Sequence, residues 1–367
     1  MTAYCGDRSC RAVVDGDPGF VHAMMFDRDT PISLPGEDRF GRTALATRVA
    51  NVIAEAGDQA GLVVGIHGES GSGKTSLLQL VGSDLASRTD VVSVRFNPWM
   101  LEASPGPLIP AFFATVSAAF RFENRSELRR LDKLFRNYGV VCSTSFPPGM
   151  TSMSMGDDAR GPGDALQVST IGHLSVQIDE ALHDAGLRVV VFIDDVDRLG
   201  WVEIQAILRL VRVLANVTRM AFVLACDPVL VNARLDEQFQ AEGRSDSAGA
   251  ALLEKVVQVP IALSFPDDAA LRRLTLDAVE NACLGAGMGL TPDEAARFGQ
   301  RFERALLRLV RTPRRARRYA NTLALSLPLF KREDGCIVEH LCREGLRLLA
   351  PDAERLADAA SISGPPN

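Results

Sequence analysis

The sequence predicts an α/β protein with a mostly parallel central sheet flanked by helices, followed by a helical lid or C-terminal domain. Two observations predict the sheet. Short, almost continuous apolar runs are typical of strands covered on both faces, and helical patterns separate most of these runs. A third observation predicts the helical domain, because only helical patterns remain between residues 267 and 352.

Five segments are expected to form strands. They are Gly61–Ile66, Val91–Phe96, Arg188–Asp194, Met220–Cys226 and Val256–Leu263. Helices are expected over Lys74–Ser87, Val202–Ala215 and Pro228–Gln240, in alternation with strands. The apolar segment Leu108–Phe120 is interpreted as an amphipathic or buried helix. No run of about 18 apolar residues occurs, so no transmembrane span is expected.

Composition narrows the class of protein. Of the 367 residues, 47% are hydrophobic and 23% are charged, which is ordinary for a globular protein. The net charge of −6 argues against a protein that coats nucleic acid or an anionic membrane uniformly. Seven cysteines without CxxC spacing, in a chain without a signal peptide, indicate reduced thiols and a cytoplasmic location.

Three parts are expected along the chain. Residues 1–25 are interpreted as a flexible leader, residues 26–266 as the core, and residues 267–367 as the helical lid or C-terminal domain. Within the core, residues 143–172 are rich in Ser, Met, Gly and Pro without periodicity, and they are interpreted as a flexible insert.

A phosphate-binding loop is expected at GESGSGKT, Gly68–Thr75, which fits the P-loop (Walker A) pattern G-x-x-x-x-G-K-[ST] between a strand and a helix. Glycines allow a tight loop that points backbone N–H groups at phosphates, and the helix N-terminus adds partial positive charge. The fold is therefore expected to be that of a P-loop NTPase that binds a nucleotide and Mg²⁺. Lys74 is expected to reach the β- and γ-phosphates, and the Thr75 hydroxyl to ligate magnesium. The expected nucleotide-binding residues are Gly68, Glu69, Ser70, Gly71, Ser72, Gly73, Lys74, Thr75 and Ser76.

Carboxylates end the expected strand in RVVVFIDDVDRL. Asp194 is expected to hold the magnesium ion, directly or through water, and Asp195 to orient or deprotonate an attacking water. Arg198 is either an arginine finger for a neighbouring subunit's nucleotide or the ion-pair partner of Asp197. Asp227, which ends another strand, is expected either to contact the γ-phosphate or water, or to cap the helix that starts at Pro228.

A basic region follows in the helical part. Thr312 and Pro313 predict a helix start, with Arg314 in its first turn and able to reach the γ-phosphate. Between Arg301 and Arg318 there are eight arginines and one acid, Glu303. This row is interpreted either as a surface for nucleic acid or an anionic headgroup, or as a solvated helical face.

With these residues in place, the chain resembles the KAP family of P-loop NTPases, in the AAA+/STAND neighbourhood. The likeness rests on ordered motifs between residues 26 and 321: FDRDTPISLPGEDRFGR, GESGSGKTSLL, RFNPWML, FIDDVDRL, ACDP, LLEKVVQVPIALS and TPRRARRYAN. The resemblance implies ATP as the nucleotide, and no guanine-reading Asn-Lys-x-Asp motif occurs.

Two residues in RFNPWML carry much of that likeness. Asn97 is expected to hydrogen-bond the catalytic carboxylates or water, and Trp99 to anchor the turn, most simply by packing in the core. Many family members insert membrane-spanning helices before the Walker B strand. This interval contains no span, so the chain resembles a member that lacks the insert. Bacterial members are often implicated in defence against phage and plasmids.

Three functions remain open on the sequence alone. The first is a Mg-dependent ATPase that acts as a switch or motor for an unknown protein partner, with a homo-oligomer left open. The second is a P-loop kinase with a small acceptor. The third is a DNA-stimulated ATPase that uses the Arg301–Arg318 face.

Overall fold

The computed structural model describes residues 29–56, 61–100, 108–120, 126–145, 162–241 and 248–351. The leader expected over residues 1–25 lies outside these ranges, as does the central part of the insert, residues 146–161.

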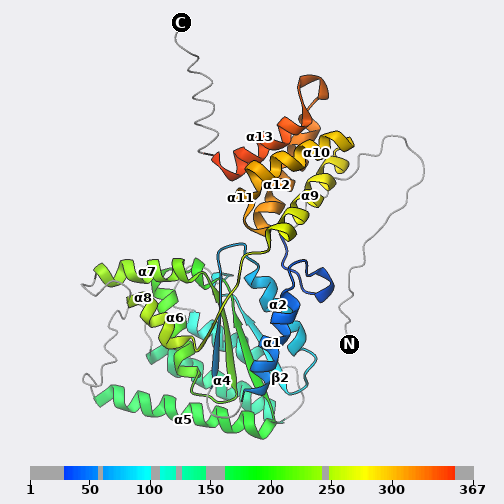
Figure 1. The fold of residues 1–367 in the computed structure, drawn as a ribbon. Helices are drawn as coiled ribbons and strands as arrows, with labels where there is room; N and C mark the ends of the chain where they lie inside the picture. The colour runs from blue at the N-terminus through cyan, green and yellow to red at the C-terminus, as the bar shows by residue number, and fades with distance from the viewer. Residues whose placement is uncertain are drawn as a thin grey trace. The chain divides into compact units, whose positions relative to one another are not determined.

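A five-stranded parallel sheet forms the centre of the fold, with the strand order β2-β3-β4-β1-β5 (Figure 1). The strands are β1 (Leu62–His67), β2 (Val91–Phe96), β3 (Arg188–Ile193), β4 (Met220–Cys226) and β5 (Val259–Ala262). Strand β4 lies between β1 and β3, which places an additional strand between the P-loop strand and the acidic strand. The expected α/β fold class is therefore confirmed.

Helices cover both faces of this sheet, because alternate residues of each buried strand point to opposite faces. On β3, Val189 and Val191 join one buried cluster, whereas Val190 and Phe192 join the other. The second cluster contains α1 (Arg42–Glu55) and α2 (Lys74–Leu85). The first contains residues of α3 (Leu108–Ala118), α4 (Ser126–Ser145), α5 (Pro162–Ala185), α6 (Trp201–Leu214), α7 (Pro228–Ala241) and α8 (Ala248–Val256).

Two expectations about these elements are wrong. The strand expected over Val256–Leu263 is shorter, because Val256 is the last residue of α8. Strand β5 lies at the edge of the sheet and is largely exposed, with Val259 37% exposed, so it is not covered on both faces. The insert expected over residues 143–172 is also too long, because α4 continues to Ser145 and α5 begins at Pro162.

The chain divides into two compact units. The P-loop unit comprises Asp29–Leu274 and Val310–Ala316, and the helical unit comprises Thr275–Leu309 and the described residues from Arg317 onward. Helices α9 (Asp268–Gly285) and α12 (Pro313–Ser326) each begin in the P-loop unit and continue into the helical unit. The domain boundaries expected from the sequence stay a prediction.

The helical unit is built around residues at four-residue spacing. Phe298, Phe302 and Leu306 are at most 2% exposed, on α10 (Pro292–Arg301) and the π-helical segment η4 (Phe302–Leu306) that continues into α11 (Leu307–Val310). Steps of four residues drift by about 40° on an α-helix with 3.6 residues per turn. The wider π turn reduces that drift and keeps these side chains on one buried face. Helix α13 (Ile337–Leu349) completes the unit, and its Leu341 carbonyl accepts a hydrogen bond from the buried Tyr319 hydroxyl at 2.7 Å.

None of the helices in the described ranges combines the length and the apolar character that crossing a bilayer demands.

Candidate nucleotide-binding and hydrolysis site

The P-loop connects the end of β1 to the start of α2, as the motif requires. Gly71 and Gly73 have φ of +82° and +101°, a left-handed conformation that side chains disfavour. A Cβ at Gly71 would lie 2.9 Å from the Cβ of Arg314, so glycine is needed there for space as well as for backbone conformation. The loop is therefore held in a tight turn ahead of the first N–H groups of α2.

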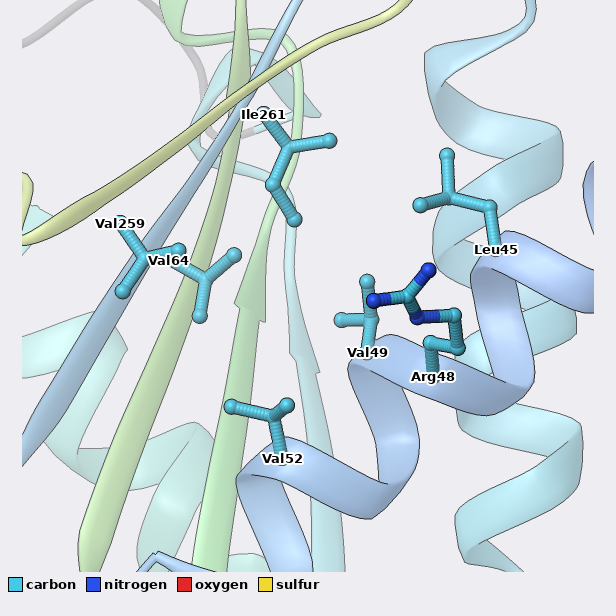
Figure 2. A pocket seen from close by; sticks show the side chains of 7 residues that line it. All are labelled: Leu45, Arg48, Val49, Val52, Val64, Val259 and Ile261. Carbon is cyan, nitrogen blue, oxygen red and sulfur yellow. The ribbon is translucent and has the colours of Figure 1, made fainter.

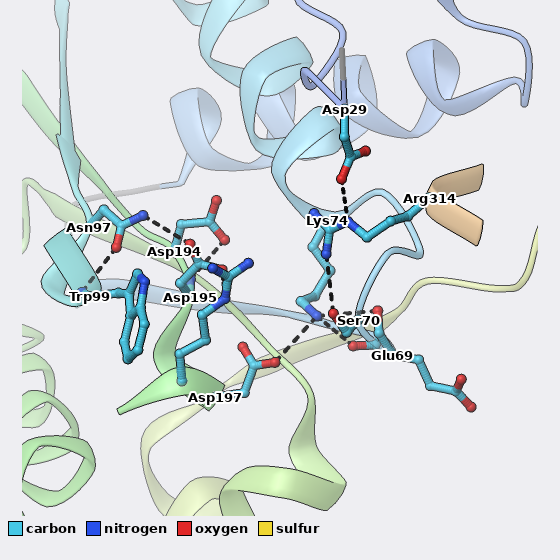
Figure 3. Close-up of polar contacts among 12 residues, drawn as sticks. Asp29, Glu69, Ser70, Lys74, Asn97, Trp99, Asp194, Asp195, Asp197 and Arg314 are labelled. Atoms are coloured by element: carbon cyan, nitrogen blue, oxygen red, sulfur yellow. Dashed lines mark hydrogen bonds and ion pairs between the residues drawn. The ribbon is translucent and has the colours of Figure 1, made fainter. Parts of the chain in front are cut away.

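Lys74, the first residue of α2, points back into this loop (Figure 3). Its Nζ donates hydrogen bonds to the carbonyl oxygens of Gly68 at 2.7 Å and Glu69 at 3.3 Å, and lies 3.8 Å from Asp197 Oδ2. The Ser72 hydroxyl is buried and has no hydrogen-bond partner in the structure. A buried ammonium group and an unsatisfied hydroxyl together fit a loop that binds a polar anionic ligand.

Thr75 and Asp194 come together from different elements. Their side chains share a hydrogen bond, with Thr75 on α2 and Asp194 directly after β3. Burial raises the pKa of the Asp194 carboxyl above its usual range, and the charge of neighbouring Asp195 adds to this effect, against the Thr75 hydrogen bond. Hard oxygen ligands of this kind suit Mg²⁺, which is commonly held by few protein groups together with phosphates. The pair therefore fits a magnesium ion bound with a nucleotide.

Asp195 is fixed by two neighbours (Figure 3). Its backbone has a left-handed φ of +58°, a conformation uncommon for a residue other than glycine. Asn97 Nδ2 donates to Asp195 Oδ2 at 3.0 Å, and Arg198 Nε lies 2.9 Å from Asp195 Oδ1. The side-chain amide oxygen of Asn97, Oδ1, in turn accepts the Trp99 N–H at 3.0 Å. The hydrogen bond expected between Asn97 and the strand-end carboxylates is thus present, to Asp195.

Two expectations about this group are wrong. Arg198 does not pair with Asp197; it pairs with Asp195, while Asp197 faces Lys74. Trp99 is not a core anchor, because its side chain is 53% exposed on η2 (Pro98–Met100). The short 3₁₀ turn after Asn97 directs the indole outward, and the Asn97 side chain stabilises the turn in its place.

Arg314 also lies at the P-loop, within the P-loop unit. Its Nη1 donates to the Ser70 hydroxyl at 3.2 Å, and its Nε lies 2.5 Å from Asp29 Oδ2. Thr312 accepts the Arg315 N–H at 3.3 Å, as expected of a residue that caps the start of α12. The remaining sequence-predicted P-loop residue, Ser76, accepts the Ile32 N–H at 3.3 Å.

The helix-cap interpretation of Asp227 agrees with the structure. Its carboxylate accepts the Val229 N–H at 3.0 Å, at the start of α7. Cys226, the residue before it, is buried, and burial raises the pKa of its thiol to about 12. That thiol is therefore protonated and inert at neutral pH.

Two neighbours of the site were not found from the sequence: Asp29, which holds Arg314, and His67, at the end of β1. Asp197 was named, but as a partner of Arg198 and not of Lys74. Burial lowers the pKa of His67, and its Nε2 atom is buried without a hydrogen-bond partner in the structure. The contact of Asp29 joins residues 285 positions apart, a separation that no local pattern reveals.

A separate hollow of about 300 Å³ lies between α1 and the edge of the sheet (Figure 2). Its lining is apolar except for Arg48, with side chains from α1, β1 and β5: Leu45, Arg48, Val49, Val52, Val64, Val259 and Ile261. It includes none of the P-loop residues or strand-end carboxylates, so we do not assign it to the nucleotide.

Comparison with known proteins agrees with this geometry. The model of the KAP family P-loop domain matches residues 42–330. The chain belongs to the KAP family of P-loop NTPases. This KAP protein is 27% identical over 266 residues to the phage T7 exclusion protein of Escherichia coli strain K12, a match that covers 64% of the chain and 34% of that protein. The matched part is therefore about a third of the relative's length.

Solved structures with a similar arrangement of elements share little sequence with this KAP protein. An ORC1 protein of Aeropyrum pernix in complex with DNA gives a TM-score of 0.43 at 14% identity, over 89% of this chain and 69% of that one. A Walker-type ATPase of Pyrococcus abyssi gives 0.40 at 13% identity, over 92% and 80%. Likenesses at this level add nothing to the fold described above.

Proposed function

We propose that this KAP protein binds and hydrolyses MgATP and uses the cycle as a switch or motor for a protein partner. One observation carries the proposal. The P-loop ammonium of Lys74, the Thr75–Asp194 pair and the held carboxylate of Asp195 all lie at the carboxyl ends of strands β1 and β3. In open α/β sheets, ligands bind at this edge.

Each residue then has a distinct role. Lys74 moves from the loop carbonyls to the β- and γ-phosphate oxygens, and the backbone N–H groups of Gly68–Thr75 bind the remaining phosphate oxygens. Thr75 and Asp194 would hold Mg²⁺, which would neutralise charge on the phosphates. Asp195 orients an attacking water and accepts its proton, while Asn97 fixes the direction of that carboxylate. Arg314 contacts the γ-phosphate in place of Ser70.

Hydrolysis is favoured over transfer to a small acceptor by the placement of Asp195. Its two oxygens are held by Asn97 and Arg198, so the carboxylate is presented in one orientation next to Asp194. Hydrolysis requires such a positioned base for the attacking water, whereas phosphoryl transfer by a kinase also requires a pocket for the acceptor.

The biological setting is proposed from the relative alone. A phage exclusion protein acts against a phage, and we propose a role in bacterial defence for this chain, in the cytoplasm. Because the match covers 34% of that protein, its partner and target do not transfer with the fold.

Release of phosphate from MgATP tests the proposal. Asp195→Asn should keep ATP binding and lower turnover by about 100-fold or more, the usual contribution of a positioned acid or base. Lys74→Ala should lose both binding and turnover. Lys255→Ala, at an exposed lysine of α8, is the matched control and should behave as the wild type. Full turnover in Asp195→Asn would rule out the assigned role of that carboxylate. ATP binding without release in the wild type would favour the kinase or an activator-dependent switch.

A homo-oligomer is a separate part of the proposal. Arg198 is half exposed, and its partner is Asp195 of its own chain. If it acts on a neighbouring subunit's nucleotide, mixing Arg198→Ala with Asp195→Asn protein should restore turnover that neither has alone. Absence of rescue at any mixing ratio would leave Arg198 with its local ion pair only.

A further inference from the structure

The structure sorts the eight arginines between residues 301 and 318 into two groups. Five are engaged: Arg301 with Glu339, Arg311 over the Phe265 ring, Arg314 with Asp29, and Arg315 and Arg317 in further polar contacts. For the other three, Arg304, Arg308 and Arg318, the side chains have no ion pair, hydrogen bond or ring contact within the part of the chain that the structure describes. All three are exposed, and all three belong to the helical unit.

Two of these three arginines, Arg304 and Arg308, lie on the same continuous helix as a further exposed arginine. Arg297, on α10, is likewise exposed and without a partner among the described residues. Arg304 and Arg308 follow seven and eleven residues later, within and just after the π-helical segment η4. Phe298, Phe302 and Leu306 of the same continuous helix are instead buried in the core of the unit. We call Arg297, Arg304 and Arg308 the arginine row.

We propose that the arginine row binds the phosphate backbone of nucleic acid. An unpaired guanidinium is a strong, planar donor for phosphate oxygens, and three of them exposed along one continuous helix match a polyanion better than a single small anion. No aromatic side chain of this helix is exposed to stack on bases, because both of its phenylalanines are buried. The contact is therefore to phosphates and independent of base sequence.

A membrane surface fits the row less well. A helix that lies on a bilayer needs apolar side chains beside its basic face. Here the large aromatic side chains of the helix are used in the core of the unit, and the row is flanked by polar and small exposed residues such as Gln300 and Ala305. The face could attract anionic lipid by charge, but it has no apolar part to insert.

Binding of a DNA duplex by the full chain tests this assignment. The probe is a labelled 20-base-pair duplex of mixed sequence, and the readout is fluorescence anisotropy at salt concentrations from about 50 to about 200 mM. Three phosphate contacts predict a slope of log K against log salt of about −2.7, so affinity falls about 40-fold over that range. Arg304→Gln with Arg308→Gln should reduce the slope to about −0.9.

The matched control removes two exposed arginines from another helix of the same unit. Arg343→Gln with Arg347→Gln acts on α13, where Arg347 lies 3.8 Å from Glu344, and it should keep the wild-type slope. Retained MgATP binding in both double variants shows that the P-loop unit is folded, independently of the proposed hydrolysis. No binding by the wild type, or an equal loss in both double variants, would overturn the proposal. Row-dependent binding to phosphatidylserine vesicles without binding to DNA would replace it with a membrane surface.

Discussion

At the scale of single residues, the most informative group is Asp194, because its environment in the ligand-free protein disfavours the ionised form of its carboxyl. Burial raises the pKa of its carboxyl, and Asp195 next to it adds to the effect. A group whose pKa is raised in the folded state is protonated more readily there than in the unfolded chain. Its ionised form therefore lowers stability, and a bound cation would relieve that cost.

We expect Asp194→Asn to raise the melting temperature of the ligand-free protein at neutral pH while abolishing Mg-dependent nucleotide binding. The gain should shrink as the pH falls from the raised pKa toward the ordinary aspartate value of about 3.9, because the wild-type carboxyl is then neutral as well. Each kcal/mol of unfolding free energy corresponds to a shift in melting temperature of about 2–4 °C for a domain of this size. Scanning calorimetry measures the shift. Asp179→Asn is the contrasting variant. Asp179 accepts hydrogen bonds from the N–H and hydroxyl groups of Thr218, so its replacement should lower the melting temperature of the protein. A lower melting temperature for Asp194→Asn at pH 7 would contradict this account.

Asp29 is a second residue whose role depends on charge. Its carboxylate lies 2.5 Å from Arg314 Nε, so it competes with phosphate for the same guanidinium. Both side chains are more than a third exposed, so the pair itself adds little to stability.

We expect Asp29→Asn to bind MgATP several-fold more tightly than the wild type, and Arg314→Ala to bind it more weakly, with little change in melting temperature for either. Isothermal titration with a non-hydrolysable ATP analogue measures both affinities. Weaker binding by Asp29→Asn would mean that the carboxylate positions Arg314 for the nucleotide and does not compete with it.

At the scale of elements, the P-loop requires glycine for two different reasons, backbone conformation and the space available for a side chain. Gly71 and Gly73 both have left-handed φ, but only Gly71 has side chains within 4 Å of an added Cβ, those of Arg314 at 2.9 Å and Thr312 at 3.2 Å. The loop and the start of α12 thus fit against each other at Gly71.

We expect Gly71→Ala to destabilise the P-loop unit more than Gly73→Ala. Backbone strain costs about 1–3 kcal/mol at each position, and Gly71→Ala adds a steric clash that moves Arg314 away. Urea unfolding followed by tryptophan fluorescence measures the difference, because Trp99 and Trp201 both lie in the P-loop unit. Equal losses of unfolding free energy in the two variants would show that Arg314 moves away from the loop without an energetic cost.

Much of the element pattern could be predicted from the sequence. Strands β2 and β4 have the expected ends because turn residues or charges bound their apolar runs. The expected strand at Val256 was wrong because an apolar run continues from the end of α8 into β5, and periodicity does not mark the change. The outward turn of Trp99 was missed for a different reason. Its position depends on a 3₁₀ turn fixed by the Asn97 side chain, not on hydrophobicity.

The candidate site was predictable where one short segment carries the chemistry. The P-loop and the two strand-end carboxylates are local motifs, so their residues could be named in advance. The pairing of Arg198 with Asp195 depends on the left-handed backbone of Asp195, which the sequence does not reveal. The contact of Asp29 with Arg314 needs the folded path of the whole P-loop unit.

At the scale of the whole molecule, α12 is a helix that belongs to both compact units. Its first turn, with Arg314, belongs to the P-loop unit, and its remainder from Arg317 belongs to the helical unit. If the proposed contact between Arg314 and the phosphate forms, it engages the first turn of a helix whose backbone continues into the helical unit. The proposed switch would act through this helix.

Hydrogen exchange can follow that path. A non-hydrolysable ATP analogue with Mg²⁺ should protect amides of the P-loop and α2 in the wild type and, to a smaller extent, those of α12 beyond Arg317. At 100 times the dissociation constant, binding contributes about 2.7 kcal/mol to the unit that holds the ligand. Arg314→Ala should keep the protection of α2 and lose that of α12, because the ligand no longer engages the helix. Lys74→Ala, which removes binding, should show neither change. If α12 gains protection equally with and without Arg314, the signal passes by another route, of which α9, the other helix that belongs to both units, is the first to test.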